Sequence, residues 1–376
     1  MEKIVLYSSN QVNKIPLTGG VRRFRELADH LGDYCSLVVM TGDEIFNVPQ
    51  GTSHVSTHQQ IVLTTEKELA RHNRKYLKSL KKNSYDWIIA FDVPPAFWLA
   101  LYRIPHLCLM VRKDLIGYEK ISLDARKIFG IKRFAMLSAF SLAELLTMLY
   151  AEKIIVQCEY DKNELIKRHR LFKYNISRKT SVQINNVNPS WAQESAIEKT
   201  PDNNLFKVGT VNGFADLRKG CDIFLEAVSA LIDEGVPVEG YIAGDGELLQ
   251  FYKEKYKGYV GIHFSGRVSN PTDYIKQFDL AVVPSRADSC PNTIMEALYN
   301  NIPVIASNVG GIPEILKSDF ALFDPISAEL KRKLADLAIN KDSLNELKKL
   351  QAVRKQELTF DWTQKIFESI IGDNNS

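Results

Sequence analysis

The chain has 376 residues, of which 45% are hydrophobic and 25% charged, and its formal net charge is +3. These values are typical of a globular protein and argue against a disordered or fibrous chain, and the length allows two domains that each bury a core. The five cysteines are scattered, with no CxxC pair and no Cys/His cluster, which argues against a disulfide framework or a zinc site and favours a reducing, cytoplasmic setting.

The charge is unevenly distributed along the chain. Residues 1–190 contain 28 Lys and Arg against 18 Asp and Glu, whereas residues 191–376 contain 20 against 27. A basic half beside an acidic half can bind an anionic surface. The alternative is a solvated basic face that has no partner.

The N-terminal half begins directly with the strand-like run IVLYSS, so no signal peptide is expected. A helix is predicted over residues 20–32, because Val21, Phe24, Leu27 and Leu31 fall on one helical face. Four more apolar runs predict strands, at residues 36–42, 87–93, 106–111 and 153–159.

The most apolar window of the chain runs from Arg133 to Tyr150. It carries Arg133 and Glu144, and it is shorter than the roughly 20 residues that a spanning helix needs. It is therefore not expected to cross a membrane.

Residues 189–204 are polar, lack periodicity and contain two prolines, so they predict a linker. The C-terminal half then alternates strands and helices. Strands are predicted at 205–211, 238–244, 261–266, 280–285, 303–307 and 320–325, with helices from about 219 and 292 and near 247–256, 271–278 and 311–317. Apolar strands that alternate with helices indicate a parallel sheet buried on both faces. The fold class is therefore α/β, with two doubly wound Rossmann-like domains and ligands expected beyond the carboxyl ends of the strands.

Two basic or glycine-rich segments follow predicted strands. Gly19 and Gly20 open a helix, and free backbone N–H groups there suit a phosphate, although a flexible loop with a glycine cap is an equal alternative. Arg218 and Lys219 lie at the start of a helix, where a positive charge interacts unfavourably with the helix dipole. A bound anion would offset this interaction, so the pair indicates an anion site. A solvated basic pair is the alternative.

The segment SRADSCPNTIMEAL begins where the strand at 280–285 ends. Asp288 lies in the loop and can accept hydrogen bonds from hydroxyls. The N–H groups of Asn292 and Thr293 lie in the first turn of a helix and can bind a phosphate oxygen. Glu296, one turn further on, can accept two hydrogen bonds from a ribose. A site for hydroxyls, a diphosphate and a ribose describes a nucleotide sugar, whereas an N-cap acid and a first-turn acid are the structural alternative.

The longer run PSRADSCPNTIMEALYNNIPVIASNVGGIPEIL resembles the donor-binding signature of family 4 retaining glycosyltransferases with the GT-B fold. The resemblance extends to Gly19-Gly20, INNVNP, RKG, IAGDGE and HFSGRV. It implies an acceptor-binding domain over 1–190, a linker over 191–204, a nucleotide-sugar-binding domain over 205–360, and a C-terminal helix within 361–376 that packs back on the first domain.

The resemblance also implies roles for individual residues. Lys219 and Arg218 would neutralise the donor diphosphate, and Asp288 would hold the hydroxyls of the donor sugar. The backbone at Asn292 and Thr293 would bind the phosphates, and Glu296 the ribose. The remaining donor-binding positions are Gly266 and Arg267 beside the nucleobase and Gly19 and Gly20, of which Gly20 approaches the diphosphate from the first domain.

Three positions depart from the family pattern. Asp288 replaces the usual Glu, and Thr210 stands where many members have Arg. Near the end of the strand at 106–111, where many members have His, the chain has Val111 or Arg112, and His106 comes too early. The residue that positions the acceptor is therefore not assigned.

The chemistry that the resemblance implies is metal-free retaining transfer of a hexosyl or N-acetylhexosaminyl group from a nucleotide sugar, expected to be a UDP-sugar. The expected acceptor is a glycan or a polyprenyl-diphosphate-linked glycan of a bacterial surface polysaccharide. No nucleic-acid module is visible. Basic segments at 67–82 and 125–137 suggest peripheral contact with an anionic membrane. A GT-B sugar-nucleotide epimerase and a non-catalytic partner subunit are the alternatives.

Overall fold

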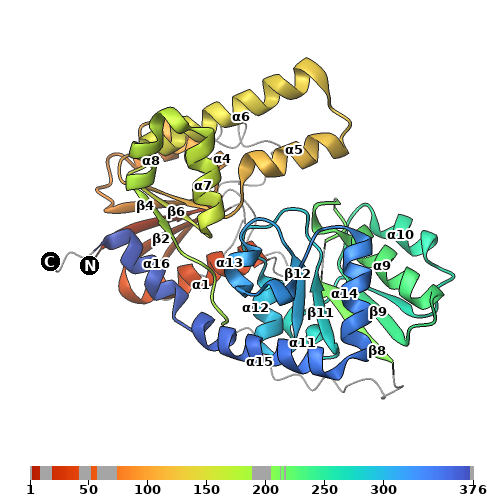
Figure 1. Ribbon diagram of the computed structural model, residues 1–376. Helices are drawn as coiled ribbons and strands as arrows, with labels where there is room; N and C mark the ends of the chain where they lie inside the picture. The colour runs from red at the N-terminus through yellow and green to blue at the C-terminus, as the bar shows by residue number, and fades with distance from the viewer. Residues whose placement is uncertain are drawn as a thin grey trace. The chain divides into compact units, whose positions relative to one another are not determined.

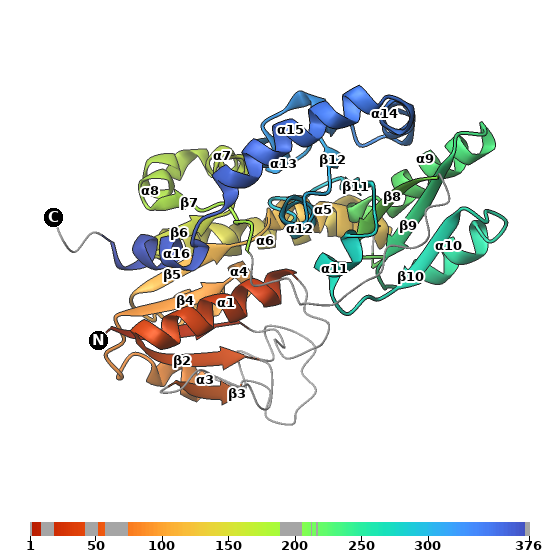
Figure 2. The ribbon, with the colours of Figure 1, turned by 90° about the horizontal axis from the view of Figure 1, so that it is seen from below.

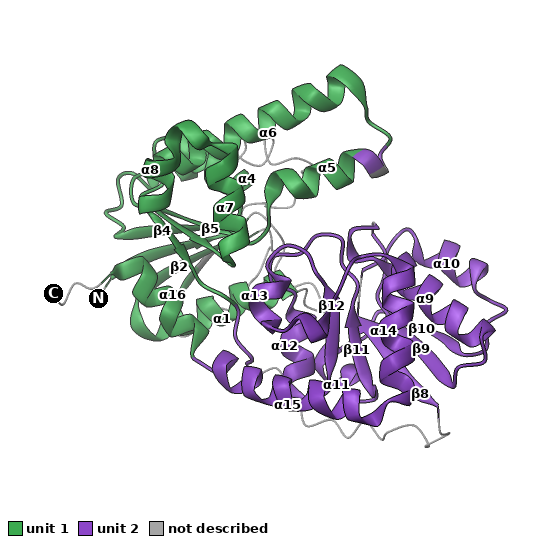
Figure 3. Cartoon of the chain, viewed as in Figure 1, with its two compact units in different colours: residues 1–123, 127–184, 361–376 green, residues 124–126, 185–360 purple. Residues whose placement is uncertain are grey.

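The computed structural model describes residues 2–8, 19–41, 52–56, 74–188, 205–211, 213–215 and 217–372. The chain forms two compact units (Figure 3). Unit 1 comprises Met1–Leu123, Lys127–Ile184 and Asp361–Ser376, and unit 2 comprises Asp124–Arg126 and Asn185–Phe360. The predicted linker, residues 191–204, lies outside the described residues.

Unit 1 is built on a parallel sheet flanked by helices (Figure 1). The sheet has seven strands in the order β3-β2-β1-β4-β5-β6-β7. Hydrogen-bonded neighbours run parallel throughout, as apolar strands joined by crossover helices require. The strands are β1 (Lys3–Tyr7), β2 (Ser36–Thr41), β3 (Ser53–Ser56), β4 (Trp87–Phe91), β5 (Leu107–Val111), β6 (Lys153–Val156) and β7 (Thr180–Val182).

Helices supply a hydrophobic core on each face of this sheet. On one face, α1 (Gly19–Tyr34) and α16 (Trp362–Ile371) contact each other (Figure 2). The Phe24 ring of α1 packs edge-on against Phe91 of β4, with ring centroids 5.0 Å apart. The other core unites the strands with residues from six helices, namely α5, described below, and α3 (Arg74–Ser79), α4 (Val93–Leu101), α6 (Gly130–Tyr150), α7 (Glu159–Arg168) and α8 (Lys173–Arg178). The hairpin partner of α6 is α5 (Leu115–Ala125), and the short turn η1 (Arg170–Phe172) joins α7 to α8.

Unit 2 has a six-stranded parallel sheet with the order β10-β9-β8-β11-β12-β13. Its strands are β8 (Phe206–Val211), β9 (Val238–Ala243), β10 (Ile262–Gly266), β11 (Leu280–Val283), β12 (Val304–Ser307) and β13 (Leu322–Phe323). Its helices are η3 (Leu217–Lys219), α9 (Cys221–Asp233), α10 (Leu249–Lys255), α11 (Pro271–Ile275), α12 (Asn292–Tyr299), α13 (Ile312–Leu316), η4 (Asp319–Ala321), α14 (Ser327–Ile339) and α15 (Lys341–Leu358).

The predicted fold class, α/β with two doubly wound parallel sheets, is confirmed. Each strand that the sequence predicted is present. The structure adds β3 and β7, whose sequences SHVS and TSV are too short and too polar for the apolar pattern to indicate a strand.

The length argument about the apolar window at 133–150 was wrong. The helix that contains it, α6, starts at Gly130 and has 21 residues. By length and composition alone it is the one helix among the described residues that is apolar enough to cross a bilayer, and only 17% of its most apolar window is buried.

The start of α16 offers a test of how unit 1 holds its C-terminal helix. Asp361 caps this helix, because its Oδ1 atom accepts a hydrogen bond from the Gln364 N–H at 2.9 Å. That bond lowers the pKa of Asp361 below 3.8. We expect Asp361→Ala to lower the free energy of unfolding by about 1 kcal/mol at neutral pH.

The pH dependence of this effect has a defined sign. The folded-state pKa of Asp361 is depressed, so its contribution is fully present above the unfolded value and is lost as the pH falls through the folded value. Urea unfolding at pH 7 and near pH 3 measures it, with Glu346→Ala, an exposed position on α15, as the control. A difference between wild type and Asp361→Ala that is the same at both pH values contradicts the assignment.

Candidate functional site

The loops that follow β8 and β11 in unit 2 pack against each other through Gly220. This residue has φ of 70°, in the left-handed region, and a Cβ atom on it would lie 1.8 Å from the carbonyl oxygen of Pro284. Any side chain here would push the two loops apart. Gly220 thus brings Lys219, in η3, beside the loop that carries Asp288.

Lys219 and Asp288 form an ion pair at this edge of the sheet. The Lys219 Nζ atom lies 2.5 Å from Asp288 Oδ2, and the Ser285 hydroxyl donates to the same oxygen at 3.4 Å. The side chains are 28% and 12% exposed, so both atoms remain within reach of a ligand. The structure therefore brings together two residues that the sequence singled out separately. It places Lys219 in a 3-10 turn before α9 rather than inside the helix.

Two arginines fix the position of the Asp288 loop. Arg218 donates from Nη1 to the Ala287 carbonyl at 3.3 Å, and the Arg286 N–H donates to the Arg218 carbonyl at 2.7 Å. The guanidinium of Arg286 also makes two hydrogen bonds to Asp222, at 2.7 and 2.6 Å. These bonds raise the pKa of Arg286. Sequence analysis missed this arginine, whose only signal was its place two residues before Asp288.

The helix α12 begins at Asn292, directly after Pro291, as the sequence predicted. The Asn292 Oδ1 atom accepts from Asn185 Nδ2 at 3.0 Å, and the Thr293 hydroxyl donates to the Val211 carbonyl at 3.4 Å. Glu296 is only 4% exposed. These contacts hold the first turn of the helix in place at the carboxyl ends of β8 and β11.

The glycine pair at 310–311 closes on the same loop. The Gly311 N–H donates to the Asp288 carbonyl at 3.2 Å. Gly310 has φ of 56°, and a Cβ atom there would lie 2.1 Å from that carbonyl oxygen. The GGIPE segment of the sequence signature is thus explained by close backbone packing on Asp288.

Gly266 and Arg267 lie at the carboxyl end of β10, at the same edge of the sheet. Gly266 has φ of 65°, and its carbonyl accepts from the Gly244 N–H at 2.7 Å. Arg267 pairs with Asp245, with Nη2 and Oδ2 3.1 Å apart and both side chains about half exposed. These two residues belong to the β9–β10 side of unit 2.

In unit 1 the first turn of α1 approaches Arg112. A Cβ atom on Gly20 would lie 2.3 Å from Arg112 Nη1, so the glycine leaves room for the guanidinium. Gly19 is the first residue of the helix. Arg112 follows directly after β5, which is where the sequence departs from the histidine of the family pattern.

Arg112 is held by Asp92, which follows β4. Arg112 Nη2 lies 2.6 Å from Asp92 Oδ2, and its backbone N–H donates to Oδ1 at 3.1 Å. The guanidinium also lies over the Phe91 ring, 4.9 Å from its centroid. Asp92 has φ of 72° and ψ of 163°, a backbone conformation that is almost confined to glycine. The backbone of Asp92 is strained, and its carboxylate orients a neighbouring arginine. This combination is typical of a functional site, and the sequence did not show it.

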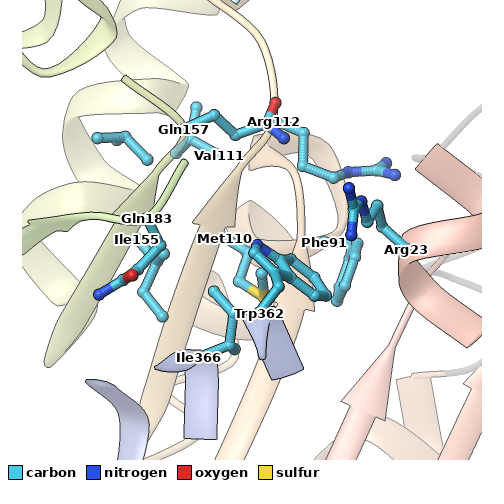
Figure 4. Close-up of a pocket in the computed structure, with 11 residues that line it drawn as sticks. Arg23, Phe91, Met110, Val111, Arg112, Ile155, Gln157, Gln183, Trp362 and Ile366 are labelled. Atoms are coloured by element: carbon cyan, nitrogen blue, oxygen red, sulfur yellow. The ribbon is translucent and has the colours of Figure 1, made fainter. Parts of the chain in front are cut away.

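A small pocket of unit 1 lies between the carboxyl ends of β5 and β6 and helix α16 (Figure 4). The pocket has room for about one water molecule, and its polar side chains are those of Arg23, Arg112, Gln157, Gln183 and Trp362. Within the described part of the chain, the buried Nε of Arg112 and Nε1 of Trp362 have no hydrogen-bond partner. Buried polar groups in proteins usually have a hydrogen-bond partner, so these two donors make the pocket a candidate binding point within unit 1.

Two other departures from the family pattern are now placed. Thr210 is fully buried inside β8, so it cannot take the place of a cation at the surface of the site. His106 precedes β5, at the amino end of the strand, and its Nδ1 atom lies 3.3 Å from Glu152. It therefore lies at the wrong edge of the sheet to act with Arg112.

Among the residues that the structure describes, no group of three His, Cys, Asp or Glu side chains is placed to hold a metal ion.

Comparison with known proteins shows what the site-bearing part of the chain is similar to. The model of Glycosyl transferases group 1 matches residues 205–340, which contain the Lys219–Asp288 pair and α12. Protein CapJ of Staphylococcus aureus is 28% identical over 204 residues, 52% of this chain and 50% of CapJ. The O-antigen biosynthesis glycosyltransferase WbnH of Escherichia coli is 29% identical over 114 residues, 30% of this chain and 32% of WbnH. The chain thus matches half or less of the length of these two relatives.

Solved structures match along the whole chain. HepE of Anabaena in complex with UDP and glucose has a TM-score of 0.74 at 17% identity, covering 99% of this chain and 100% of HepE. The sucrose-phosphate synthase of Thermosynechococcus elongatus has a TM-score of 0.77 at 15% identity, covering 98% of each chain. WaaG, a glycosyltransferase of lipopolysaccharide biosynthesis, has a TM-score of 0.71 at 15% identity, covering 98% of this chain and 100% of WaaG. The chain therefore has the GT-B glycosyltransferase fold, and its residues 205–340 are similar to the group 1 glycosyltransferases.

Proposed function

We propose that the protein is a retaining glycosyltransferase of family 4 that moves a hexosyl or N-acetylhexosaminyl group from a UDP-sugar to a glycan or a lipid-linked glycan. The observation that carries the proposal is the Lys219–Asp288 pair beside the first turn of α12, within the region that matches the glycosyltransferase family. The names of CapJ, WbnH and the teichuronic acid glycosyltransferase TuaC favour bacterial surface polysaccharide as the product. HepE, which shares the fold, is described with UDP and glucose, which favours a UDP-sugar as donor.

The ion pair is proposed as the resting state of the donor site. The donor diphosphate brings its own negative charge to Lys219, and Asp288 is then released to accept hydrogen bonds from sugar hydroxyls. Arg218 and the N–H groups of Asn292 and Thr293 add to the field at the diphosphate, and Glu296 holds the ribose. These groups are already in position to stabilise the negative charge that develops on the leaving diphosphate. Such preorganised electrostatic stabilisation is usually the largest contribution to the rate of an enzyme.

Retention of configuration follows if the leaving diphosphate takes the proton of the acceptor hydroxyl on the face from which it departs. In this scheme neither Asp288 nor Glu296 moves a proton, since each is placed as a hydrogen-bond acceptor. Lys219 and Arg218 supply the positive charge, so the reaction is proposed to need no metal. We further propose that the protein acts in the cytoplasm and meets lipid-linked acceptors through peripheral contact of unit 1 with an anionic membrane.

Release of nucleoside diphosphate from a panel of nucleotide sugars tests the proposal. With no acceptor present, we expect slow hydrolysis of one UDP-sugar, lost in Glu296→Ala and unchanged by a chelator. Activity that a chelator abolishes and Mg²⁺ restores contradicts the metal-free chemistry. Conversion of the donor into an isomeric nucleotide sugar identifies an epimerase instead. The absence of any turnover across donors and acceptors contradicts an enzymatic function.

A further inference from the structure

The helix α6 has an unusual distribution of polar and apolar side chains. The residues that face outward are apolar: Ile131 is 87% exposed, Phe134 73%, Leu142 56% and Leu146 46%. These positions recur at helical spacing and share one face of the helix with the exposed residues Ala135, Ser138 and Ala139. We call this surface, from Ile131 to Leu146, the outer face of α6.

The inner face of α6 carries the buried acid of this helix. Glu144 is completely buried, and its Oε2 atom accepts from Arg168 Nη1 at 2.7 Å and lies 2.8 Å from His169 Nε2. Arg168 Nη2 also lies 2.5 Å from Asp114 Oδ1, and these carboxylates raise the pKa of Arg168. Thr147 and Met148 are buried on the same side of the helix. A charged network therefore anchors α6 to α7 and the rest of unit 1.

This arrangement is the reverse of that in an ordinary surface helix, which turns its apolar side inward. The contrast with α15 is direct, because the exposed positions of α15 include Lys341, Asp342, Glu346, Lys348 and Lys349. A continuous apolar face left open to water is costly, and in a soluble domain it marks an interaction surface.

Positive charge surrounds the start of the outer face. Arg126 and Lys127 are exposed in the turn between α5 and α6, and Lys132 is exposed in the first turn of α6. The outer face itself, over the seven residues named above, contains no acid. Apolar side chains flanked by Lys and Arg complement the boundary between acyl chains and anionic headgroups. The charge thus favours an anionic bilayer over a second copy of the chain, whose α6 would bring the same cations to the interface.

We propose that α6 docks unit 1 on an anionic membrane, with the helix lying in the interfacial plane and its outer face in the lipid. The helix is long enough to span a bilayer by composition, but spanning would expose Glu144 to lipid and break its bonds to Arg168 and His169. The buried network keeps the inner face on the protein. This inference rests on the membrane contact proposed above and assigns it to one helix face, but its test is separate from the enzymatic activity because it measures binding to lipid alone.

Vesicle flotation tests the proposal without donor or acceptor. We expect the full chain to float with vesicles of phosphatidylglycerol and phosphatidylcholine. The partition coefficient should be at least tenfold lower with vesicles of pure phosphatidylcholine. It should fall as much at about 0.5 M salt, roughly three to five times physiological ionic strength, because salt screens the attraction between exposed charges. The double substitution Ile131→Ser and Phe134→Ser is expected to lower the partition coefficient at least tenfold. Its matched control is Val260→Ser with Ile339→Ser, two exposed apolar residues of unit 2 that are 92% and 73% exposed.

A charge variant and an extraction step complete the test. Lys132→Glu is expected to weaken binding to anionic vesicles about tenfold, with Lys341→Glu on α15 as the control. Alkaline carbonate should release the bound protein, since a helix lying in the interface is extractable. Resistance to carbonate overturns the interfacial orientation in favour of a span. Equal binding to neutral vesicles, or a concentration-dependent dimer that the Ile131/Phe134 substitutions abolish, overturns the anionic membrane as the partner.

Discussion

Replacing Lys219 with alanine is expected to lower kcat/KM for sugar transfer by about 100-fold or more, the usual effect of removing one preorganised charge from the site where negative charge develops. Lys219 Nζ lies 2.5 Å from Asp288 Oδ2 at the proposed donor site. Because Lys219 is proposed to bind the developing charge, kcat should fall by more than the KM for the donor rises. Steady-state kinetics with the preferred donor measures this effect.

A purely structural role for Lys219 predicts a different pattern. The pair is 28% and 12% exposed, so its loss should cost only about 1 kcal/mol of stability and shift the melting temperature by about 4 °C at most. Lys276→Ala provides a matched control, since Lys276 Nζ lies 2.6 Å from Asp273 in the same unit. Transfer by Lys219→Ala within a few-fold of wild type contradicts the diphosphate assignment. Partial recovery in Lys219→Arg supports it.

The second large effect is expected at Arg112. Its guanidinium is oriented by Asp92 and Phe91 and lies against Gly20 at the start of α1. We expect Arg112→Ala to lower kcat/KM by about 30-fold, the effect of losing one charge-assisted hydrogen bond of about 2 kcal/mol. Arg112→Lys should recover little, because lysine cannot reproduce both the bond to Asp92 and the stacking on Phe91. Kinetics with varied donor and varied acceptor shows which substrate the arginine holds.

Asp92→Gly separates positioning from stability. Glycine relieves a backbone strain of about 1–3 kcal/mol at φ of 72°, but it removes the carboxylate that orients Arg112. The melting temperature is therefore expected to stay the same or rise while turnover falls. Arg332→Ala, which removes an exposed arginine paired with Glu329 on α14, is the control. Loss of stability together with full activity in Asp92→Gly contradicts a functional role for the pair.

Much of unit 2 could be predicted from the sequence, because its buried parallel strands are continuous apolar runs and its loops carry glycines with specific backbone demands. Gly220 and Gly310 are examples, since each lies where a side chain would strike a carbonyl oxygen. What the sequence could not show is which side chains meet. The contact between Lys219 and Asp288 joins residues 69 positions apart, and only the packing of two loops creates it.

Unit 1 was harder to predict for physical reasons. The strain at Asp92 is a property of the folded backbone, and no pattern in the sequence predicts it. Arg112 was noted only as a departure from a histidine, and its partners became visible with the fold. In the sequence α6 was visible only as an apolar window, whereas the structure shows which side is covered, with Ile131 and Phe134 outward and Glu144 inward. The composition of a helix gives the number of its apolar residues, but it does not show which face of the helix packs against the rest of the protein.

We propose that unit 2 binds the nucleoside diphosphate through the residues around α12, and calorimetric titration with UDP measures this binding. We expect UDP to bind with one-to-one stoichiometry. Glu296→Gln should weaken the binding at least tenfold, and Glu346→Gln on α15 should leave it unchanged. Titration in which UDP does not bind, or binds Glu296→Gln as tightly as wild type, would contradict this proposal.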